Sequence, residues 1–571
     1  MAMGQHENGR TRTLVGTRRA TAAAALSLSA VLAGCTSSGG GQAGTTQNPV
    51  VPVKEGGSLV IGAEQEPDCA DWISVCSGSI WGDYLMRTTT IPKVFDTRRS
   101  GDAWVPVASP LMADEPTTTT SGPQRITYRI SPDAVWSDGE PITSADLKYT
   151  ALQIRDGKDV LDKTGYDKIS KIETPDAKTA VVTLRETYGG WRTLFSSIYG
   201  VLPEHLLKGK NRNAIMKDGY SFSGGPWKIQ SWKKGTSVTL IPNDRYWGPK
   251  PKLDKVTFQF TTDTAAAFQA FKSGQLDALF PTPQLDVVEQ LNQTAGGTRR
   301  QIDAETGNLE AIWMNNEKFP FDSVDVRRAV AYAIDRTAIV KKLYGSLGVD
   351  KPAQSFLTPI LSSYAGTDFS HYTQDLKAVD KAMQGDGWAK GSDGIWAKDG
   401  RRAEFTIVSL AGNKRRELTE QILQTQLKQA GFRMTIKNTT PANLFGKQAP
   451  AGTFQMGLWT LIDTFPDPTQ SNSFSSTSIP TEANGRSGLN FVRARIDGLD
   501  PLLATVDRET DPRKRVEASR QADKIIADQV PAIPISTVPN ILLWNDRVGG
   551  PLSNNPSEGP WWNLAEWGLA K

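Results

Sequence analysis

The stretch from Ala311 to Gly345, AIWMNNEKFPFDSVDVRRAVAYAIDRTAIVKKLYG, has the clearest structural pattern in this chain of 571 residues. Residues 311–315 form a short apolar run that predicts a strand, and a loop with one proline follows. Asp322 or Ser323 then caps a helix. The apolar residues of that helix are Val326, Val330, Ala333, Ile334 and Ala338. Their spacing of three and four predicts one long amphipathic helix, which Gly345 ends in a left-handed conformation.

Composition indicates a globular protein without a strong charge bias. The hydrophobic content is 38% with 8% aromatic residues, and the length predicts roughly three to four domains. Residues 1–34 hold four arginines and one glutamate, so the formal charge falls from +4 to +1 without them. This balance gives no reason to expect a nucleic-acid partner. The three histidines, His6, His205 and His371, are a poor supply for acid–base chemistry or metal binding.

The N-terminus predicts export. Residues 10–19 are basic, and residues 20–31 form an apolar run too short to span a bilayer. The run ends in Leu-Ala-Gly-Cys at 32–35, which resembles a bacterial lipobox with Cys35 as the lipid-modified residue. We therefore expect a signal peptide over 1–34, a flexible linker over 35–55, and anchoring to the outer face of the cytoplasmic membrane. The alternative is an ordinary secretory peptide with an incidental cysteine.

Cys69 and Cys76 are the cysteines that remain after Cys35. In an exported protein such a pair predicts a disulfide, which would contribute about 2–3 kcal/mol for so short a loop. Two free thiols are the alternative. A zinc site is a weaker one, because no second cluster of Cys or His lies nearby in the sequence.

A loop rich in carboxylates and aromatic residues follows the first strand expected, at residues 58–62. Glu66, Trp81 and Tyr84 are the candidates for ligand contact there, because a loop directly after a strand can line a cleft. For each side chain the alternative is ordinary packing or a place on a solvated rim.

Four motifs carry a resemblance to a known family. They are AVWSDGEPITSADLKYT at 134–150, GPW at 225–227, YWGPKPKLDKV at 246–256 and RRAVAYAIDR at 327–336. In this order they resemble the family 5 extracellular solute-binding proteins, which are the oligopeptide- and dipeptide-binding proteins of bacterial ABC importers. The motif WSDGxPxTxxD is expected to be structural, with Thr143 or Ser144 capping a helix and Trp136 packed beneath the turn.

The resemblance implies an α/β fold of two lobes, like the type II periplasmic binding proteins, with an extra subdomain inserted in the first lobe. The first lobe would comprise residues 56–95, 221–311 and 535–571. The inserted subdomain would be 96–220, and the second lobe 312–534.

The stretch TFQMGLWTLIDTFPDPTQ, residues 453–470, is where the resemblance places the ligand. In peptide-binding relatives a Trp and an Asp follow this strand, and the Asp pairs with the peptide's α-amino group. Trp459 matches the Trp. Asp463 is the candidate Asp, but it sits one residue late from Trp459 and one residue early from Asp467-Pro468. A loop or cap carboxylate is therefore an equal interpretation of Asp463, and Asp467 is expected to hold the turn before Pro468.

Catalytic motifs are missing from the sequence. There is no G-x-S-x-G, complete P-loop or H-E-x-x-H. We expect a monomeric binding protein that is not an enzyme and has no cofactor, no metal site and no nucleic-acid partner. Its ligand would be a peptide, delivered to the permease and ATPase of an importer. Relatives that carry nickel, opines, oligosaccharides or antibiotics leave other solutes open, and an exported glycosidase with a carboxylate pair is the alternative from another class.

Overall fold

The structure is a computed structural model that describes residues 50–571 except 75, 78–79, 101–102, 120, 161–162, 197–198, 294–297, 441–442, 464, 469, 485 and 487. The expected signal peptide, Cys35 and most of the linker lie outside the described residues. None of the helices in the described part of the chain has the length and apolarity needed to cross a membrane.

A seven-stranded sheet forms the centre of the first lobe. Its strand order is β13-β22-β12-β2-β11-β10-β9. The bounds are β2 Ser58–Ala63, β9 Trp227–Lys233, β10 Ser237–Pro242, β11 Lys255–Phe260, β12 Ala278–Leu279, β13 Thr298–Asp303 and β22 Asn540–Asn545. β2 runs parallel to both β11 and β12, so its side chains are covered on both faces. Helices α6 (Thr264–Lys272) and α7 (Leu285–Gln293) pack on the sheet through Phe268, Phe271 and Leu291.

The inserted subdomain has a four-stranded antiparallel sheet of order β5-β6-β8-β7. The strands are β5 Thr117–Thr119, β6 Arg125–Arg129, β7 Ile169–Asp176 and β8 Thr179–Leu184. Thr143 caps helix α3 (Ser144–Asp156), where Asp146 accepts the N–H of Thr143 at 2.8 Å. The same carboxylate accepts the indole N–H of the fully buried Trp136 at 3.4 Å. The WSDG motif therefore has the expected structural role.

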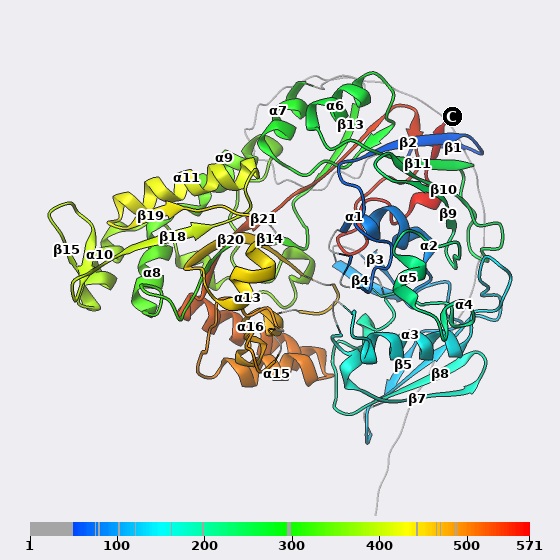
Figure 1. Cartoon of the computed structure of the whole chain (residues 1–571), viewed down its shortest axis with the longest axis horizontal. Coiled ribbons are helices and arrows are strands. Elements are labelled where there is room, and N and C mark those ends of the chain that lie inside the picture. The colour runs from blue at the N-terminus through cyan, green and yellow to red at the C-terminus, as the bar shows by residue number, and fades with distance from the viewer. Residues whose placement is uncertain are drawn as a thin grey trace, which may run out of the picture. The chain divides into compact units, whose positions relative to one another are not determined.

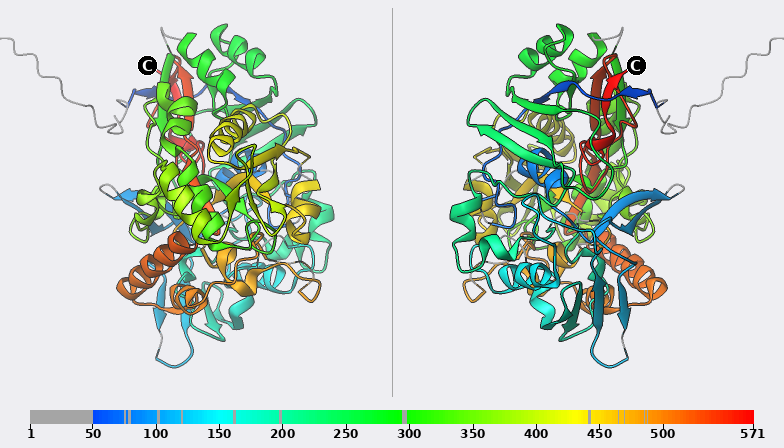
Figure 2. Two further views of the ribbon diagram at one scale, coloured as in Figure 1. Left: turned by 90° about the vertical axis from the view of Figure 1, so that its left-hand side faces the viewer. Right: turned by 90° about the vertical axis from the view of Figure 1, so that its right-hand side faces the viewer.

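The second lobe is built on a five-stranded sheet of order β19-β18-β20-β14-β21. The strands are β14 Asn308–Met314, β18 Glu404–Val408, β19 Arg433–Ile436, β20 Met456–Ile462 and β21 Ala532–Thr537. Its longer helices are α8 Val324–Ala333, α9 Arg336–Tyr344, α10 Leu376–Gly385, α11 Lys414–Gln429, α15 Leu499–Arg508 and α16 Pro512–Gln529. Figure 1 colours the chain by residue number, so blue β2 and red β22 are seen in the same sheet as green β11, and Figure 2 shows the same elements from two further sides.

The chain crosses between the two large sheets twice. It leaves β13 at Asp303 and enters β14 at Asn308, and it returns from Thr537 to Asn540. Thr306 joins the two crossings, because its hydroxyl donates to the carbonyl oxygen of Val538 at 2.8 Å. The crossings thus lie at 304–307 and 538–539, whereas the expected boundaries at 311/312 and 534/535 fall inside β14 and β21. These paired segments connect the two large sheets.

The prediction of a single long helix after Ser323 is wrong, because the structure has two helices there. Ser323 does cap α8, but Ile334 is extended (φ −103°, ψ 121°) and Asp335 caps a second helix, α9, by accepting the N–H of Ala338 at 2.8 Å. Gly345 is right-handed at φ −58°, and the left-handed residue is Gly348. Apolar spacing continues across the break, so periodicity could not reveal it. The break lets the buried Arg336 donate to the carbonyl oxygens of Pro534 and Phe369 at 2.9 and 2.7 Å.

Candidate ligand-binding site

Trp81 and Tyr84 lie together in the first lobe. They are on the short helical segments α1 (Ile80–Gly82) and η1 (Asp83–Arg87), and both rings meet Phe280 edge to face at 6.5 and 6.0 Å. Phe280 in turn contacts Trp561 near the C-terminus. Trp561 and Trp567 are fully buried in the core of the first lobe.

Glu66 belongs to a different contact. Its Oε1 accepts the indole N–H of Trp232 at 2.9 Å and the backbone N–H of Gly235 at 3.0 Å. Both donors lie at the end of β9 and the turn into β10, so the carboxylate holds that turn within the first lobe.

Trp459 packs in the interior of the second lobe. It lies on β20, is 5% exposed, and stacks on Trp313 of β14 with ring centroids 5.6 Å apart and planes 7° apart. Gly457 makes room for the ring, because a β-carbon there would lie 1.9 Å from it.

Asp463 is buried beside the first crossing. Its side-chain Oδ2 accepts the N–H of Thr358 at 2.7 Å, and its own N–H donates to Gly307 at 2.8 Å. Asp463 thus ties the loop around Thr358 to the first crossing. This contact fits a loop carboxylate, and a ligand-binding role stays a prediction.

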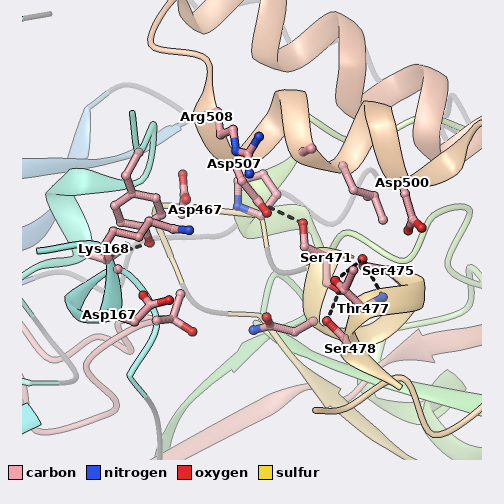
Figure 3. A pocket seen from close by; sticks show the side chains of 18 of the residues that line it. Asp167, Lys168, Asp467, Ser471, Ser475, Thr477, Ser478, Asp500, Asp507 and Arg508 are labelled. Carbon is pink, nitrogen blue, oxygen red and sulfur yellow. Dashed lines mark hydrogen bonds between the residues drawn. The ribbon is translucent and has the colours of Figure 1, made fainter. Parts of the chain in front are cut away.

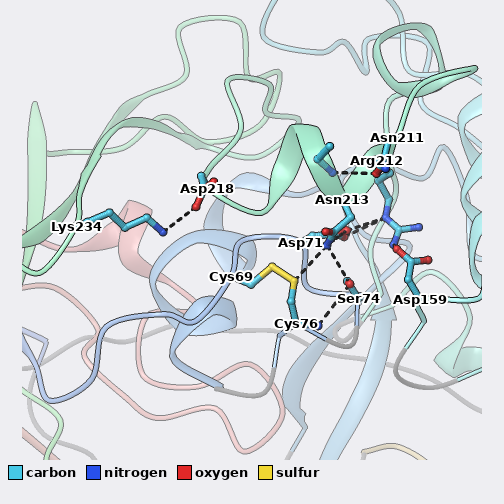
Figure 4. Close-up of a disulfide and its surroundings, with 11 residues drawn as sticks. Cys69, Asp71, Ser74, Cys76, Asp159, Asn211, Arg212, Asn213, Asp218 and Lys234 are labelled. Carbon is cyan, nitrogen blue, oxygen red and sulfur yellow. Dashed lines mark hydrogen bonds and ion pairs between the residues drawn. A yellow bond between two sulfur atoms is a disulfide. The ribbon is translucent and has the colours of Figure 1, made fainter.

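The disulfide loop is anchored to the inserted subdomain (Figure 4). Cys69 and Cys76 are bonded in the structure. Within the loop, the fully buried Asp71 pairs with Arg212 at 2.9 Å, and Arg212 also pairs with Asp159 at 2.6 Å. Burial raises the pKa of Asp71, and the Arg212 charge opposes that rise.

Two adjoining cavities have walls from both lobes. The first, which we call the aromatic cavity, has a volume of about 350 Å³ and includes Trp104, Trp191, Tyr364 and Phe465. The second, the polar cavity, has a volume of about 470 Å³. Phe465 and Asp467 line both cavities and separate them. Volumes of this size are typical of sites for small ligands.

The polar cavity is lined mainly by hydroxyl and carboxylate groups (Figure 3). The first lobe contributes Thr164, Asp167, Lys168, Tyr188 and Thr193. The second lobe contributes Ser471, Asn472, Ser475, Thr477, Ser478, Asp500, Asp507 and Arg508. None of the residues expected from the sequence to bind ligand lines either cavity.

Residues 108–481 match the model of the family described as "Bacterial extracellular solute-binding proteins, family 5 Middle". The chain belongs to this family. Protein XP55 of Streptomyces lividans is 25% identical over 470 residues, covering 80% of this chain and 81% of that protein. The oligopeptide-binding protein AppA of Bacillus subtilis is 25% identical over 457 residues, covering 78% of this chain and 80% of that protein.

Solved structures show the same fold. The periplasmic EDTA-binding protein EppA superposes with a TM-score of 0.79 at 20% identity, over 93% of this chain and all of that one. AppA of B. subtilis in complex with a nonapeptide superposes with a TM-score of 0.74 at 22% identity, over 91% of this chain and 100% of that one. The chain therefore has the type II periplasmic-binding-protein fold of the family 5 proteins, as the motifs implied.

In this family 5 protein, Asp467, which was expected to hold the turn before Pro468, has a partner far away in the sequence. It forms a buried ion pair with Arg515 of α16, whose Nε donates to the carbonyl oxygen of Val506 at 2.8 Å. Burial raises the pKa of Asp467, while Arg515 stabilises its charged form. The two residues are far apart in sequence, and no local pattern pairs them.

Gly189 and Gly190 bring the first lobe against this ion pair. The N–H of Gly189 donates to the carbonyl oxygen of Asp507 at 2.7 Å. A β-carbon on Gly190 would lie 1.9 Å from Asp467 Oδ2, and one on Gly189 would lie 2.3 Å from the carbonyl oxygen of Glu509. The adjacent glycines were a visible sequence signal for close approach, but only the structure shows their partner. This contact joins the lobes of the solute-binding protein directly beside both cavities.

Proposed function

We propose that this chain is the substrate-binding component of an ABC importer and that it captures peptides by closing its two lobes. The observation that carries the proposal is the pair of adjoining cavities whose walls come from both lobes. A ligand there contacts both lobes at once, so its binding energy favours the closed arrangement. The closed form is then what a membrane permease with its ATPase would recognise.

Peptide is the solute class that the relatives favour. AppA is named an oligopeptide-binding protein, and its structure was solved with a nonapeptide. The aromatic cavity suits apolar side chains, and the hydroxyl-rich polar cavity suits polar ones. EppA, named an EDTA-binding protein, keeps metal chelates as an alternative solute for this fold.

The remaining parts of the proposal rest on the sequence. Cys35 would carry the lipid that anchors a monomer outside the cytoplasmic membrane, with residues 35–55 as spacer. Asp463 would offset the ammonium group of the peptide, although it lies one residue away from the position that the family motif indicates. The ligand contacts expected of Glu66, Trp81, Tyr84 and Trp459 stay predictions, because each side chain already packs or bonds within its own lobe.

Thermal unfolding of the purified full-length protein against a ligand panel tests this function. The panel holds di- to nonapeptides, oligosaccharides and metal chelates. A ligand at a hundred times its dissociation constant adds about 2.7 kcal/mol to the free energy of unfolding, which raises the melting temperature measurably. Peptide-only shifts support the proposal. A shift with a chelate or sugar alone would replace the solute class, and recovery of a cleaved ligand by mass spectrometry would contradict a binding role.

A further inference from the structure

We infer that the polar cavity is a subsite for a cationic group, the ammonium or guanidinium of a lysine or arginine side chain carried by the solute. The inference rests on the proposed function, because it assigns the chemistry of one part of the peptide. It goes beyond that function in predicting a preference for basic peptides.

One face of helix α15 forms a wall of the cavity. Asp500, Leu503, Ala504 and Asp507 line it at steps of three and four, so they lie on the same side of the helix. Asp507 is in the last turn, where the helix dipole is negative and favours a cation nearby. Figure 3 shows Asp507 and Asp500 along this helix, with Ser471 and Ser475 below them.

The fixed charges around the cavity leave it negative. Its two lining cations, Lys168 and Arg508, both pair with Glu186, at 2.7 and 3.0 Å. Asp467 pairs with Arg515. These three cations are outnumbered by five carboxylates, which are Asp167, Asp467, Asp500, Asp507 and Glu186.

Asp507 is the carboxylate best placed to receive a cation from the solute. It is half-buried, and Ser471 donates a hydroxyl hydrogen bond to its Oδ1 at 2.8 Å. Among the described residues no ion pair is formed by its side chain. Burial raises its pKa to about 6, since its charged form is poorly compensated. An ammonium or guanidinium would supply that compensation, and the surrounding hydroxyl oxygens would accept its remaining hydrogen-bond donors.

The volume also fits a side chain better than a bare ion. The cavity of about 470 Å³ is far larger than one cation, and its acceptors are spread over both walls. Since Lys168 and Tyr188 come from the first lobe and Asp507 from the second, a bound side chain would lie between the lobes. Its charge would therefore also favour closure.

Isothermal titration calorimetry with matched pentapeptides tests the inference on the full-length protein. One central residue is varied among Lys, Arg and norleucine, and the N-terminus is kept constant. We expect the Lys and Arg peptides to bind about ten- to a hundredfold more tightly than the norleucine peptide, as for a charge-assisted hydrogen bond. Asp507→Asn, which keeps an oxygen for Ser471, should remove most of this preference.

Asp546→Asn is the matched control, because that carboxylate lies on the surface at Arg299. It should keep the preference. Equal affinity of the three peptides for the wild-type protein would overturn the inference, and so would a preference that survives Asp507→Asn.

Failure of the subsite is distinguishable from failure of the proposed function. Binding of the norleucine peptide reports peptide binding by itself. If no peptide binds, the peptide function fails, and agmatine, which carries a guanidinium and an ammonium, tests the cavity alone. A melting-temperature shift with agmatine that Asp507→Asn abolishes supports the subsite. No shift in the wild-type protein overturns it.

Discussion

Gly190 of the first lobe lies so close to Asp467 of the second that a β-carbon would stand 1.9 Å from the carboxylate Oδ2. Its φ of −79° is accessible to any residue, so space and not backbone conformation requires glycine here. The contact also places the lobe interface on a buried ion pair, because Asp467 is held by Arg515. At this interface a residue without a side chain therefore meets a fixed charge of the other lobe.

Gly190→Ala should weaken ligand binding. The added methyl group overpacks the closed form at a cost of about 1–3 kcal/mol, which corresponds to an increase of about 5- to 150-fold in the dissociation constant. Calorimetry measures the affinity, and small-angle X-ray scattering with ligand should give a larger radius of gyration than for the wild-type protein. Gly385→Ala is the control, since a β-carbon there meets nothing within 4 Å. Unchanged affinity for Gly190→Ala would show that the contact does not form on closure.

Arg515→Met should lower the free energy of unfolding by about 3–5 kcal/mol, because it leaves the Asp467 carboxylate buried without its cation. Urea denaturation monitored by tryptophan fluorescence measures the change. Adding Asp467→Asn to Arg515→Met should restore part of the loss, since the uncompensated charge is then gone. Lys524→Met removes the exposed pair with Asp528 and should change stability by less than about 1 kcal/mol. If Arg515→Met and Lys524→Met lowered the free energy of unfolding by the same amount, the buried pair of Arg515 with Asp467 would be contradicted.

Replacing both Cys69 and Cys76 by serine should lower the free energy of unfolding by about 2–3 kcal/mol through the loop-closure entropy of the unfolded chain. Reduction of the wild-type protein should reproduce this loss in urea denaturation. The intact mass after alkylation, with and without prior reduction, reports whether the bond is present. Alkylation of the unreduced protein at both cysteines would show free thiols instead.

Binding of the Lys pentapeptide should weaken as the pH falls through about 6. The pKa of Asp507 is raised to about 6 from its ordinary value of 3.8, so the charge that attracts the cation is lost below that pH. Well below that pH, affinity should drop by nearly tenfold per pH unit if this carboxylate dominates. The other charged groups around it are Asp167, Lys168, Glu186, Asp467, Asp500, Arg508 and Arg515.

The raised pKa of Asp507 also makes folding stability depend on pH, in the opposite direction to peptide affinity. Its contribution to stability is present in full below about 3.8 and is lost as the pH rises through about 6, because the folded state binds this proton more tightly. Asp507→Asn should flatten the pH dependence of peptide affinity measured by calorimetry between about pH 5 and 7, which are about one unit below and above the transition. A profile that keeps its shape in this variant would place the titrating group elsewhere.

Asp463→Asn should weaken the binding of free peptides more than the binding of their N-acetylated forms if Asp463 offsets the ligand's ammonium group. A charge-assisted contact of this kind corresponds to about a tenfold or greater change in the dissociation constant. Calorimetry with paired peptides measures the ratio. Equal weakening of both forms would assign the carboxylate to the Thr358 loop, where it accepts a backbone N–H at 2.7 Å.

The sequence by itself determined the family, the two-lobe fold and the local elements with short-range signals. The cap at Ser323 and the box between Thr143 and Asp146 follow from residues three positions apart, because a helix start is fixed by local hydrogen bonds. The burial of Trp136 follows from the same local turn.

Only the tertiary structure decided the break at Ile334, the place of the two crossings and the contact between Gly190 and Asp467. The partners there are distant in sequence: Arg336 bonds to Pro534, Thr306 to Val538, and Asp467 to Arg515. Periodicity and caps carry no information on such pairs, since their energies depend on which segments the fold brings together. The two cavities have the same origin, because each needs walls from both lobes.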